Sequence, residues 1–315
     1  MSVEVIKGGL LSSLQDLGRI SGLALGMPRN GVLDERAHRV ANYLVGNAPT
    51  YPTLEVTLLG PTLRFRQAAM IALGGADLGA ELSGQVLPLN QAIAVKPEDV
   101  LRFTGRKAGL RSYLAVQGGW LGESLLDSQS THLAGGYGGY QGRALKTGDV
   151  LEIANLPHLG SQILPAQFSF GDHVVRGKQA ALRMIRGPEA VTFTESSLHT
   201  WAGQTYTVQA QSNRMGCRLA GPILQRTTQR ELLSVAVSPG TVQVPPDGQP
   251  IVLLADAQTT GGYPRIAQVI SVDLPRFAQR APQDAVHMEW VDIATAQALS
   301  LAQQQAFDLL THAPR

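Results

Sequence analysis

The sequence has little of what marks a secreted protein, a membrane protein or a partner of polyanions. Cys217 is the only cysteine in 315 residues, so no internal disulfide can form and nothing indicates an oxidising compartment. Lys and Arg number 26 against 24 Asp and Glu, without runs of like charge, which argues against nucleic acid and acidic membrane surfaces as partners. No segment reaches the ~18 apolar residues of a membrane span, and the N-terminus lacks the basic start and apolar stretch of a signal peptide. We therefore expect a cytoplasmic protein.

Common motifs of metal and nucleophilic chemistry are absent as well. The seven histidines show no metal-ligand spacing and no HExxH, so no metal site is expected. No Gly-Lys-Ser or Gly-Lys-Thr marks a phosphate-binding P-loop, and no Gly-x-Ser-x-Gly marks a nucleophile elbow. Cys217, alone in a strand-like context, is more typical of a small core residue than of a nucleophile.

The sequence contains many short segments that alternate apolar and polar residues, which is the period of a β-strand. Its 34 Gly and 18 Pro fall between these segments as turns. One hairpin is predicted from 54–58 to 62–65 and another from 242–244 to 251–254. Further strands are predicted at 111–116, 150–153, 181–185, 205–210 and 268–272. This pattern favours a mainly β protein built as a closed barrel or sandwich.

Few helices are expected. Asp34 can cap a helix over 35–45 that ends at Gly46. A short helix is predicted at 194–201 and a longer one at 292–310.

An internal echo suggests that the chain has two halves. The turn at 97–99 leads into a strand at 100–103, and the similar turn at 282–284 leads into a strand at 285–290. The polar, proline-containing stretch 155–167 is the best candidate for a linker. We therefore expect an N-terminal half over 1–155, a C-terminal half over 168–291 and a C-terminal helix over 292–315.

Three polar segments of the N-terminal half are candidates for a site. Asp16 and Arg19 flank a glycine turn and could grip a polar ligand, although a loop salt bridge is favoured by spacing alone. Glu55 and Thr57 share one face of a strand, where a partly desolvated carboxylate could act as a general base. The third segment, 128–143, combines hydroxyls with glycines and could cradle an oxyanion, or it could be a mobile loop.

Two segments of the C-terminal half carry further candidates. Arg214 could bind a carboxylate through two parallel hydrogen bonds and Asn213 could orient an amide, while an Asx turn with Arg214 in solvent is an equal alternative. The segment 256–264 joins an Asp, an amide, two hydroxyls and two glycines in a few residues. That is more functionality than a turn requires, so a functional interpretation is preferred there.

Six segments together resemble, in this order, the motifs of one family. They are SLQDLGR, LEVT, RSYLAVQGG, STHLAGGYGGYQGRALKTGD, QSNRMGCRLAGP and VQVPPDGQPIVLLADAQTTGGYPRIA. The family is called allophanate hydrolase subunit 2 and includes the C subunit of 5-oxoprolinase, and the resemblance covers nearly the whole chain.

The resemblance implies a fold of two cyclophilin-like β-barrel halves with a few peripheral helices. It also implies partners: a small cyclophilin-like subunit of the 5-oxoprolinase B type and a lactam-utilisation subunit of the A type. With them, bacterial members open 5-oxo-L-proline to L-glutamate using ATP. The related region of urea carboxylase carries carboxyltransferase activity, and some members are described as antagonists of a histidine-kinase inhibitor. All three functions stay open.

No cofactor is assigned to this chain, because it has neither a P-loop nor the Ala-Met-Lys-Met motif of biotin attachment. ATP would be used by the complex, and biotin would be needed only for the carboxyltransferase function. The substrate in either case is a small amide.

The resemblance also implies site residues. Glu55 or Asp256 is expected to be the general base, Arg214 to bind a substrate carboxylate, and Thr259 with Thr260 to stabilise an oxyanion. We expect the 256–262 segment to converge with Arg214 and Glu55. The expected substrate-binding residues are Asp16, Arg19, Thr57, Ser130, Thr131, Asn213, Arg214, Gln243 and Gln258. Asn30 and Ala134 stand where many members are expected to have Ser and Arg, so a substrate contact is expected to be missing or supplied elsewhere.

Overall fold

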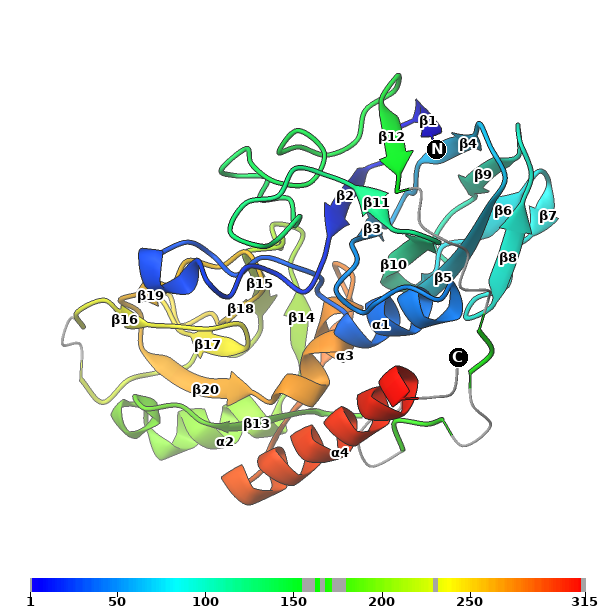
Figure 1. The fold of residues 1–315 in the computed structure, drawn as a ribbon. Coiled ribbons are helices and arrows are strands. Elements are labelled where there is room, and N and C mark those ends of the chain that lie inside the picture. The colour runs from blue at the N-terminus through cyan, green and yellow to red at the C-terminus, as the bar shows by residue number, and fades with distance from the viewer. Residues whose placement is uncertain (1, 155–161, 165–167, 172–179, 229–231, 313–315) are drawn as a thin grey trace. The chain divides into compact units, whose positions relative to one another are not determined.

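A computed structural model describes residues 2–154, 162–164, 168–171, 180–228 and 232–312 (Figure 1). The chain divides into two compact units. The first comprises Met1–Ser21, Asn30–Phe168 and Phe307–Arg315, and the second comprises Gly22–Arg29 and Ser169–Ala306. Most of the predicted linker at 155–167 lies outside the described residues. Within the described ranges, no helix is long and apolar enough to cross a membrane.

The first unit consists of two sheets whose strands pair antiparallel. The larger sheet has the order β11-β12-β1-β4-β9-β6-β7, and the smaller has the order β2-β3-β10-β5-β8. The strands of the larger sheet are β1 (Ser2–Lys7), β4 (Thr62–Phe65), β6 (Ala80–Leu82), β7 (Gln85–Val86), β9 (Val100–Phe103), β11 (Trp120–Leu121) and β12 (Val150–Ile153). Those of the smaller sheet are β2 (Leu11–Gln15), β3 (Thr53–Thr57), β5 (Ala69–Asp77), β8 (Ala92–Val95) and β10 (Ala108–Val116).

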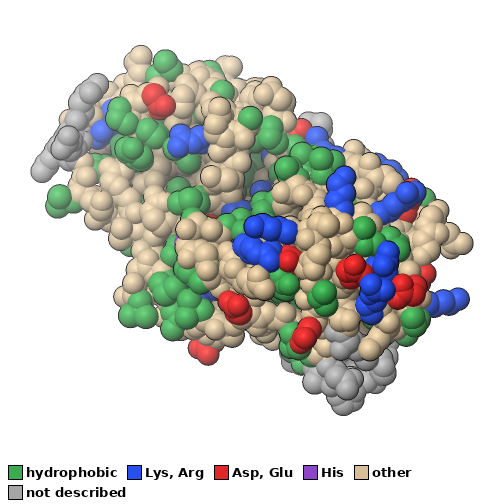
Figure 2. All heavy atoms as spheres, turned by 90° about the horizontal axis from the view of Figure 1, so that it is seen from above, with side chains coloured by type: hydrophobic (Ala, Val, Ile, Leu, Met, Phe, Trp, Pro, Cys, Tyr) green, Lys and Arg blue, Asp and Glu red, His purple; other side chains and the backbone are tan. Residues whose placement is uncertain are grey.

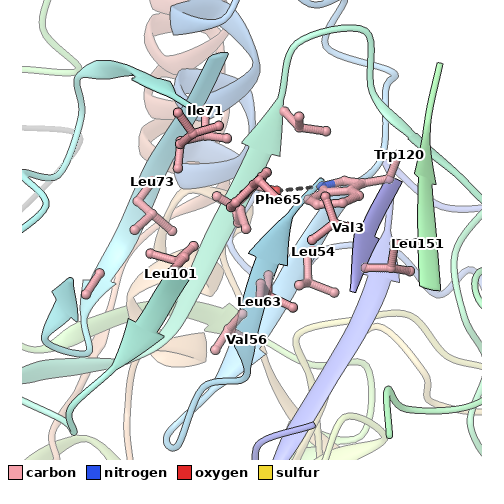
Figure 3. Close-up of a cluster of buried hydrophobic side chains, with 14 of the residues drawn as sticks. Val3, Leu54, Val56, Leu63, Phe65, Ile71, Leu73, Leu101, Trp120 and Leu151 are labelled. Atoms are coloured by element: carbon pink, nitrogen blue, oxygen red, sulfur yellow. Dashed lines mark hydrogen bonds between the residues drawn. The ribbon is translucent and has the colours of Figure 1, made fainter. Parts of the chain in front are cut away.

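The core of the first unit is formed by apolar side chains from both sheets (Figure 3). Leu63 and Phe65 of β4 and Leu54 and Val56 of β3 are all fully buried, as strand alternation predicts. Trp120 lies at the edge of this cluster, where its indole N–H donates to the Leu114 carbonyl at 3.0 Å. Burial of each Leu, Val or Phe side chain in this cluster contributes roughly 1.5–3 kcal/mol of hydrophobic stabilisation.

The hairpin predicted over residues 54–65 is wrong, although both of its strands exist. β3 pairs with β2 and β10, whereas β4 pairs with β1 and β9. The connection takes the chain from one sheet to the other, and Leu58 adopts a φ of +61° at the corner. The alternation of apolar and polar residues locates a strand but does not identify the strand that pairs with it. The Gly60-Pro61 turn therefore resembles a hairpin turn although the strands on either side of it do not pair.

Helix α1 (Glu35–Leu44) begins as predicted. The Asp34 carboxylate accepts from the Ala37 amide at 3.1 Å. The helix packs against β5 and β10. At Gly74 of β5 a Cβ atom would lie 2.5 Å from the Ala37 carbonyl oxygen, so the close approach of helix and sheet requires glycine there.

His38 of α1 is buried in a neutral form. Its Nε2 lies 2.9 Å from the Pro49 carbonyl oxygen and must donate, so Nδ1 accepts from the Thr53 hydroxyl at 2.9 Å. Burial lowers the pKa of His38 to about 4, although the hydrogen bond to Pro49 acts in the opposite direction. The folded chain therefore resists protonation of a ring that protonates near pH 6.5 when unfolded.

Because the pKa of His38 is lowered on folding, its contribution to stability is present above pH 6.5 and is lost as the pH falls towards 4. We expect the free energy of unfolding to drop by up to about 3 kcal/mol in this window. Denaturant unfolding between pH 7 and 4 should show this loss in the native chain and a shallower dependence in His38→Gln. Equal pH dependence in the two proteins would contradict the prediction.

The outer face of the larger sheet carries charges of both signs. Glu4 pairs with Arg64, Arg66 with Glu98, and Arg102 with Glu81. Side chains of opposite charge also lie next to one another on the face that Figure 2 shows. Exposed pairs of this kind each contribute at most about 1 kcal/mol, so they set surface charge more than stability.

The second unit is an eight-stranded sheet with the order β21-β14-β15-β18-β17-β20-β13-β22. Its strands are β13 (Leu182–Arg186), β14 (Tyr206–Val208), β15 (Gly216–Ala220), β17 (Thr241–Gln243), β18 (Ile251–Leu253), β20 (Arg265–Val269), β21 (Ala285–Val286) and β22 (Met288–Trp290). β21 and β22 are consecutive along the chain, and they pair with the two opposite ends of the sheet. Residues 285–290 therefore close the sheet into a barrel. A separate two-stranded sheet joins β16 (Val235–Ala236) to β19 (Thr260–Gly261).

The helices of the second unit are short except for the last. They are the 3₁₀ helices η1 (Leu23–Leu25), η2 (Ala190–Thr192) and η3 (Ser271–Asp273), and the α-helices α2 (Glu195–Gly203), α3 (Leu274–Ala278) and α4 (Ile293–His312), whose residues from Phe307 onwards belong to the first unit. The predicted hairpin between β17 and β18 is confirmed, with Val242 opposite Val252. The strand predicted at 268–272 is wrong in its second part, since β20 ends at Val269 and η3 follows. The predicted mainly β fold of two barrel halves is confirmed.

The similarity between the two turns at 97–99 and 282–284 extends to their hydrogen bonds. In the 96–99 and 281–284 turns, the final Asp carboxylate accepts from the first amide of the turn, and the third residue has a φ of +69° or +72°. Each turn also exchanges two backbone hydrogen bonds with one neighbouring residue, Phe65 or Val208. A third copy occurs at 146–149, where Gly148 takes the positive-φ position and Val5 is the neighbour.

Candidate functional site

Strand β3 places Glu55 at the centre of a polar row on the face of the smaller sheet that points away from the core. Leu54 and Val56 point into the core, so Glu55 points to the opposite face. Ser13 of β2 and Tyr113 of β10 lie directly opposite Glu55 in register and therefore share its face.

The Glu55 carboxylate is held by groups from β10 and from the start of α1. Its Oε2 accepts from the Tyr113 hydroxyl at 2.8 Å and from the Leu33 amide at 3.2 Å. The Arg111 Nε lies 3.8 Å from Oε1. Burial raises the pKa of Tyr113 well above 10, and the neighbouring Glu55 charge adds to this, so the phenol stays protonated. Glu55, which is 2% exposed, is thus a fixed and oriented hydrogen-bond acceptor.

Two buried polar atoms near Glu55 have no hydrogen-bond partner among the described residues. One is the Thr57 hydroxyl, two residues along β3 on the same face. The other is Oε1 of Gln15, whose Nε2 donates to the Ser13 hydroxyl at 3.0 Å and to the Thr131 carbonyl at 3.1 Å. An unmatched buried polar atom costs about 1–3 kcal/mol, so the polarity of this face is not explained by packing alone.

Asp16 binds the 128–130 segment. Its Oδ1 accepts from the Ser128 hydroxyl at 2.7 Å, from the Ser130 hydroxyl and from the Gly18 amide, and its Oδ2 accepts from the Gln129 amide at 2.6 Å. Four donors from the chain itself thus satisfy this carboxylate. Asp16 and Ser130, both expected to bind substrate, contact each other, and in the described structure these contacts hold a loop.

Arg19 is 1% exposed and binds the same loop rather than Asp16. Its guanidinium donates to the Ser130 carbonyl at 2.5 Å and to the Asn30 side-chain oxygen, and it lies 4.9 Å from the centre of the Tyr137 ring. Asn30 has a φ of +55°, a conformation that Asn tolerates better than most residues. Asn30 therefore supplies a partner for Arg19.

The glycines of the 128–143 segment do not present a free row of amides. The amides of Gly136, Gly139 and Gly142 each donate to a carbonyl of the chain. A Cβ atom at Gly139 would lie 2.0 Å from the Thr131 hydroxyl, so glycine is needed there for packing. Thr131 itself donates to the Leu14 carbonyl at 3.0 Å. These contacts favour a packed loop over an oxyanion cradle.

In the second unit, Arg214 and Asp256 form a buried pair with two parallel hydrogen bonds. Arg214 Nε lies 2.9 Å from Oδ2 of Asp256 and Nη2 lies 3.0 Å from Oδ1, with both side chains less than 5% exposed. The Asp256 amide also donates to the Arg214 carbonyl at 3.0 Å. Arg214 was expected to bind a substrate carboxylate and Asp256 to act as a base, but in this structure each engages the other.

The remaining candidates of the second unit lie in different environments. Asn213 forms an Asx turn, accepting from the Met215 amide at 2.8 Å. Gln243 is buried and donates to the Tyr263 carbonyl at 3.3 Å. Gln258 and Thr260 are exposed, and Thr259 is half-buried with its hydroxyl 3.4 Å from the Gly26 carbonyl.

The structure therefore joins Arg214 with Asp256 and groups Glu55 with Thr57. Glu55 belongs to the first unit and the 256–262 segment to the second, so their expected convergence stays a prediction. Arg111, Tyr113 and Gln15 were missed as site residues. The strand of Arg111 and Tyr113 was predicted and that of Gln15 was not, and only the pairing register shows that all three share a face with Glu55. Among the described residues, no group of three His, Cys, Asp or Glu could hold a metal ion.

Comparisons with known proteins agree with the motifs. The family described as "Carboxyltransferase domain, subdomain A and B" matches residues 25–290. The chain is 38% identical to the C subunit of 5-oxoprolinase from Escherichia coli, covering 98% of this chain and 97% of that protein. It is also 38% identical to the corresponding 5-oxoprolinase subunit of Haemophilus influenzae, covering 93% of each.

A solved structure supports the same relationship. The urea amidolyase of K. lactis matches 98% of this chain with a TM-score of 0.90 and 28% identity, and the match spans only 20% of that longer protein. The chain belongs to the carboxyltransferase-domain family, together with the C subunit of 5-oxoprolinase and the matching region of urea amidolyase.

Proposed function

We propose that the chain is one component of an ATP-dependent 5-oxoprolinase, a hydrolase that opens 5-oxo-L-proline to L-glutamate. The observation that carries this proposal is the 38% identity to the E. coli 5-oxoprolinase C subunit over nearly the full length of both chains. Because that protein is named as one subunit of an enzyme, other chains are expected to share the reaction.

Glu55 is the better of the two predicted general bases. A lactam amide reacts with water only after its carbonyl oxygen has been activated, for example by phosphorylation, and a carboxylate can then take a proton from the attacking water. Both oxygens of Asp256 are bound to the Arg214 guanidinium. Glu55 accepts at Oε2 from two uncharged donors, the Tyr113 hydroxyl and the Leu33 amide. The Arg111 Nε lies 3.8 Å from Oε1. The Thr57 hydroxyl, which has no hydrogen-bond partner among the described residues, lies on the same face.

Arg214 and Asp256 are then assigned to holding the 256–262 segment in place. Thr260 of this segment is exposed and keeps its predicted role at the oxyanion, together with Thr259.

The partners follow from motifs that this chain does not contain. It has no P-loop, so ATP binding is assigned to another chain, and a lactam-utilisation subunit of the A type is the proposed source. A small cyclophilin-like subunit of the B type completes the proposed complex.

A carboxyltransferase acting on urea is the second candidate, favoured by the TM-score of 0.90 to the urea amidolyase structure. It would require a partner that carries biotin, because this chain has no biotin attachment motif. The lower identity of 28% and the short matched share of that protein make it the weaker candidate.

Reconstitution tests the proposed function. The chain mixed with its lactam-utilisation and small cyclophilin-like partners should convert 5-oxo-L-proline to glutamate with coupled ATP hydrolysis, and the chain alone should do neither. Glutamate and phosphate release are the measurements. Coupled turnover by the chain alone, or equal turnover by the partners without it, would contradict the proposal. Urea-dependent consumption of carboxybiotin would instead favour the second candidate.

A further inference from the structure

Tyr113 joins two parts of the first unit through a single oxygen. Its hydroxyl donates to Glu55 Oε2 at 2.8 Å and accepts from the Asp34 amide at 2.8 Å. Tyr113 is fully buried, its backbone is fixed between β3 and β5, and its hydroxyl is bonded on two sides. The phenol is therefore held in one orientation.

The amides that donate to these oxygens belong to the two residues immediately before α1. The Leu33 amide donates to Glu55, and the next amide, Asp34, donates to Tyr113. The Asp34 side chain caps the helix itself by accepting from Ala37. Glu55 and Tyr113 together thus receive two consecutive amides, those of Leu33 and of the N-cap residue Asp34, immediately before α1.

We propose that Tyr113 is a positioning residue that keeps Glu55 ionised and aimed for proton abstraction. The inference rests on the proposed function insofar as Glu55 is the base of that reaction. A donor bonded to the charged form of a carboxylate lowers its affinity for a proton. Tyr113 therefore extends the pH range over which Glu55 is a base, while the substrate is bound by other groups.

Tyr113→Phe removes only the oxygen that bridges Glu55 and Asp34. In the reconstituted complex we expect kcat to fall about tenfold and KM to change less than about twofold, because orientation of the base is affected and substrate binding is not. The acid limb of the pH profile of kcat should move to higher pH by about half a unit or more. A merely structural tyrosine would not move this limb.

Tyr206 of the second unit provides a matched control. It is fully buried, and its hydroxyl donates to the Pro222 carbonyl at 2.9 Å. Tyr206→Phe therefore also removes a buried phenolic hydrogen bond, but one whose acceptor is a backbone carbonyl rather than Glu55. We expect it to leave the acid limb in place. An unshifted limb in Tyr113→Phe, or an equal shift in Tyr206→Phe, would overturn the inference.

The same claim is testable on the isolated chain if the complex does not open 5-oxoproline. Carboxyl ¹³C NMR of glutamate-labelled protein follows the Glu55 titration, which is assigned by its loss in Glu55→Gln. A midpoint that moves to higher pH in Tyr113→Phe supports the role of Tyr113 even where the proposed activity fails. An unmoved midpoint rejects it whatever the complex catalyses.

Discussion

Replacing Arg214 with methionine is expected to destabilise the second unit by about 3–5 kcal/mol. The change leaves the Asp256 carboxylate buried without the two hydrogen bonds that compensate its charge. It also weakens the link between the 212–216 turn and the segment after β18. The backbone hydrogen bond from the Asp256 amide to the carbonyl of residue 214 would remain. Denaturant unfolding followed by far-UV circular dichroism measures this loss.

The paired variant Arg214→Met with Asp256→Leu distinguishes a broken ion pair from lost packing. Removing both charges is expected to recover much of the stability, because replacing a buried pair by apolar groups is often neutral. If the single and double variants are equally unstable, the cost lies in packing and the pair has no special role. If the single variant unfolds like the native chain, Arg214 is available for a ligand, as its sequence motif suggests.

Glu55→Gln is expected to lower the turnover of the reconstituted complex by on the order of 10²–10⁴. The amide has the shape of the carboxylate and can accept from Tyr113, but it cannot take a proton from water. Assembly and 5-oxoproline binding should persist, which gel filtration and calorimetry would show.

Glu98→Gln is the matched control for this prediction. Glu98 lies in the 96–99 turn with a side chain that is 61% exposed. The chain itself has a glutamine at the corresponding position of the equivalent turn, Gln283, with nearly the same φ. This variant should turn over normally. Near-normal turnover of Glu55→Gln would remove Glu55 as the base and return attention to the 258–260 residues.

Local features of this fold were predictable from sequence. Asp34 caps α1, Pro245 to Gly248 turn β17 into β18, and short alternating segments mark most of the strands, because each depends on residues close together in the chain. The predictions were wrong where the structure of a segment depends on residues far away in the sequence. β3 and β4 have the turn of a hairpin but different partners. The segment after Val269 alternates like a strand, yet η3 begins at Ser271 and Pro275 lies in the first turn of α3.

In the candidate site, too, single residues could be predicted from the sequence but their contacts with distant residues could not. Glu55 could be singled out from its own strand, but its partner Tyr113 is brought to it by a register that no local pattern encodes. Arg214 and Asp256 were both selected as functional groups, and each was given a ligand. Their pairing with one another depends on the contact between two segments 42 residues apart, which the sequence does not reveal.

The closure of each β-structure sets an order of events during translation. Ser2 lies opposite Glu152 in the larger sheet of the first unit, and Leu182 lies opposite Met288 in the sheet of the second unit. These two sheets are therefore completed only when their last strand has left the ribosome. The segment Gly22–Arg29 is made early but belongs to the second unit, whose remaining residues begin at Ser169. A stalled or truncated chain would therefore hold this segment without its packing partners, and we expect nascent chains to be cleaved there first by proteases.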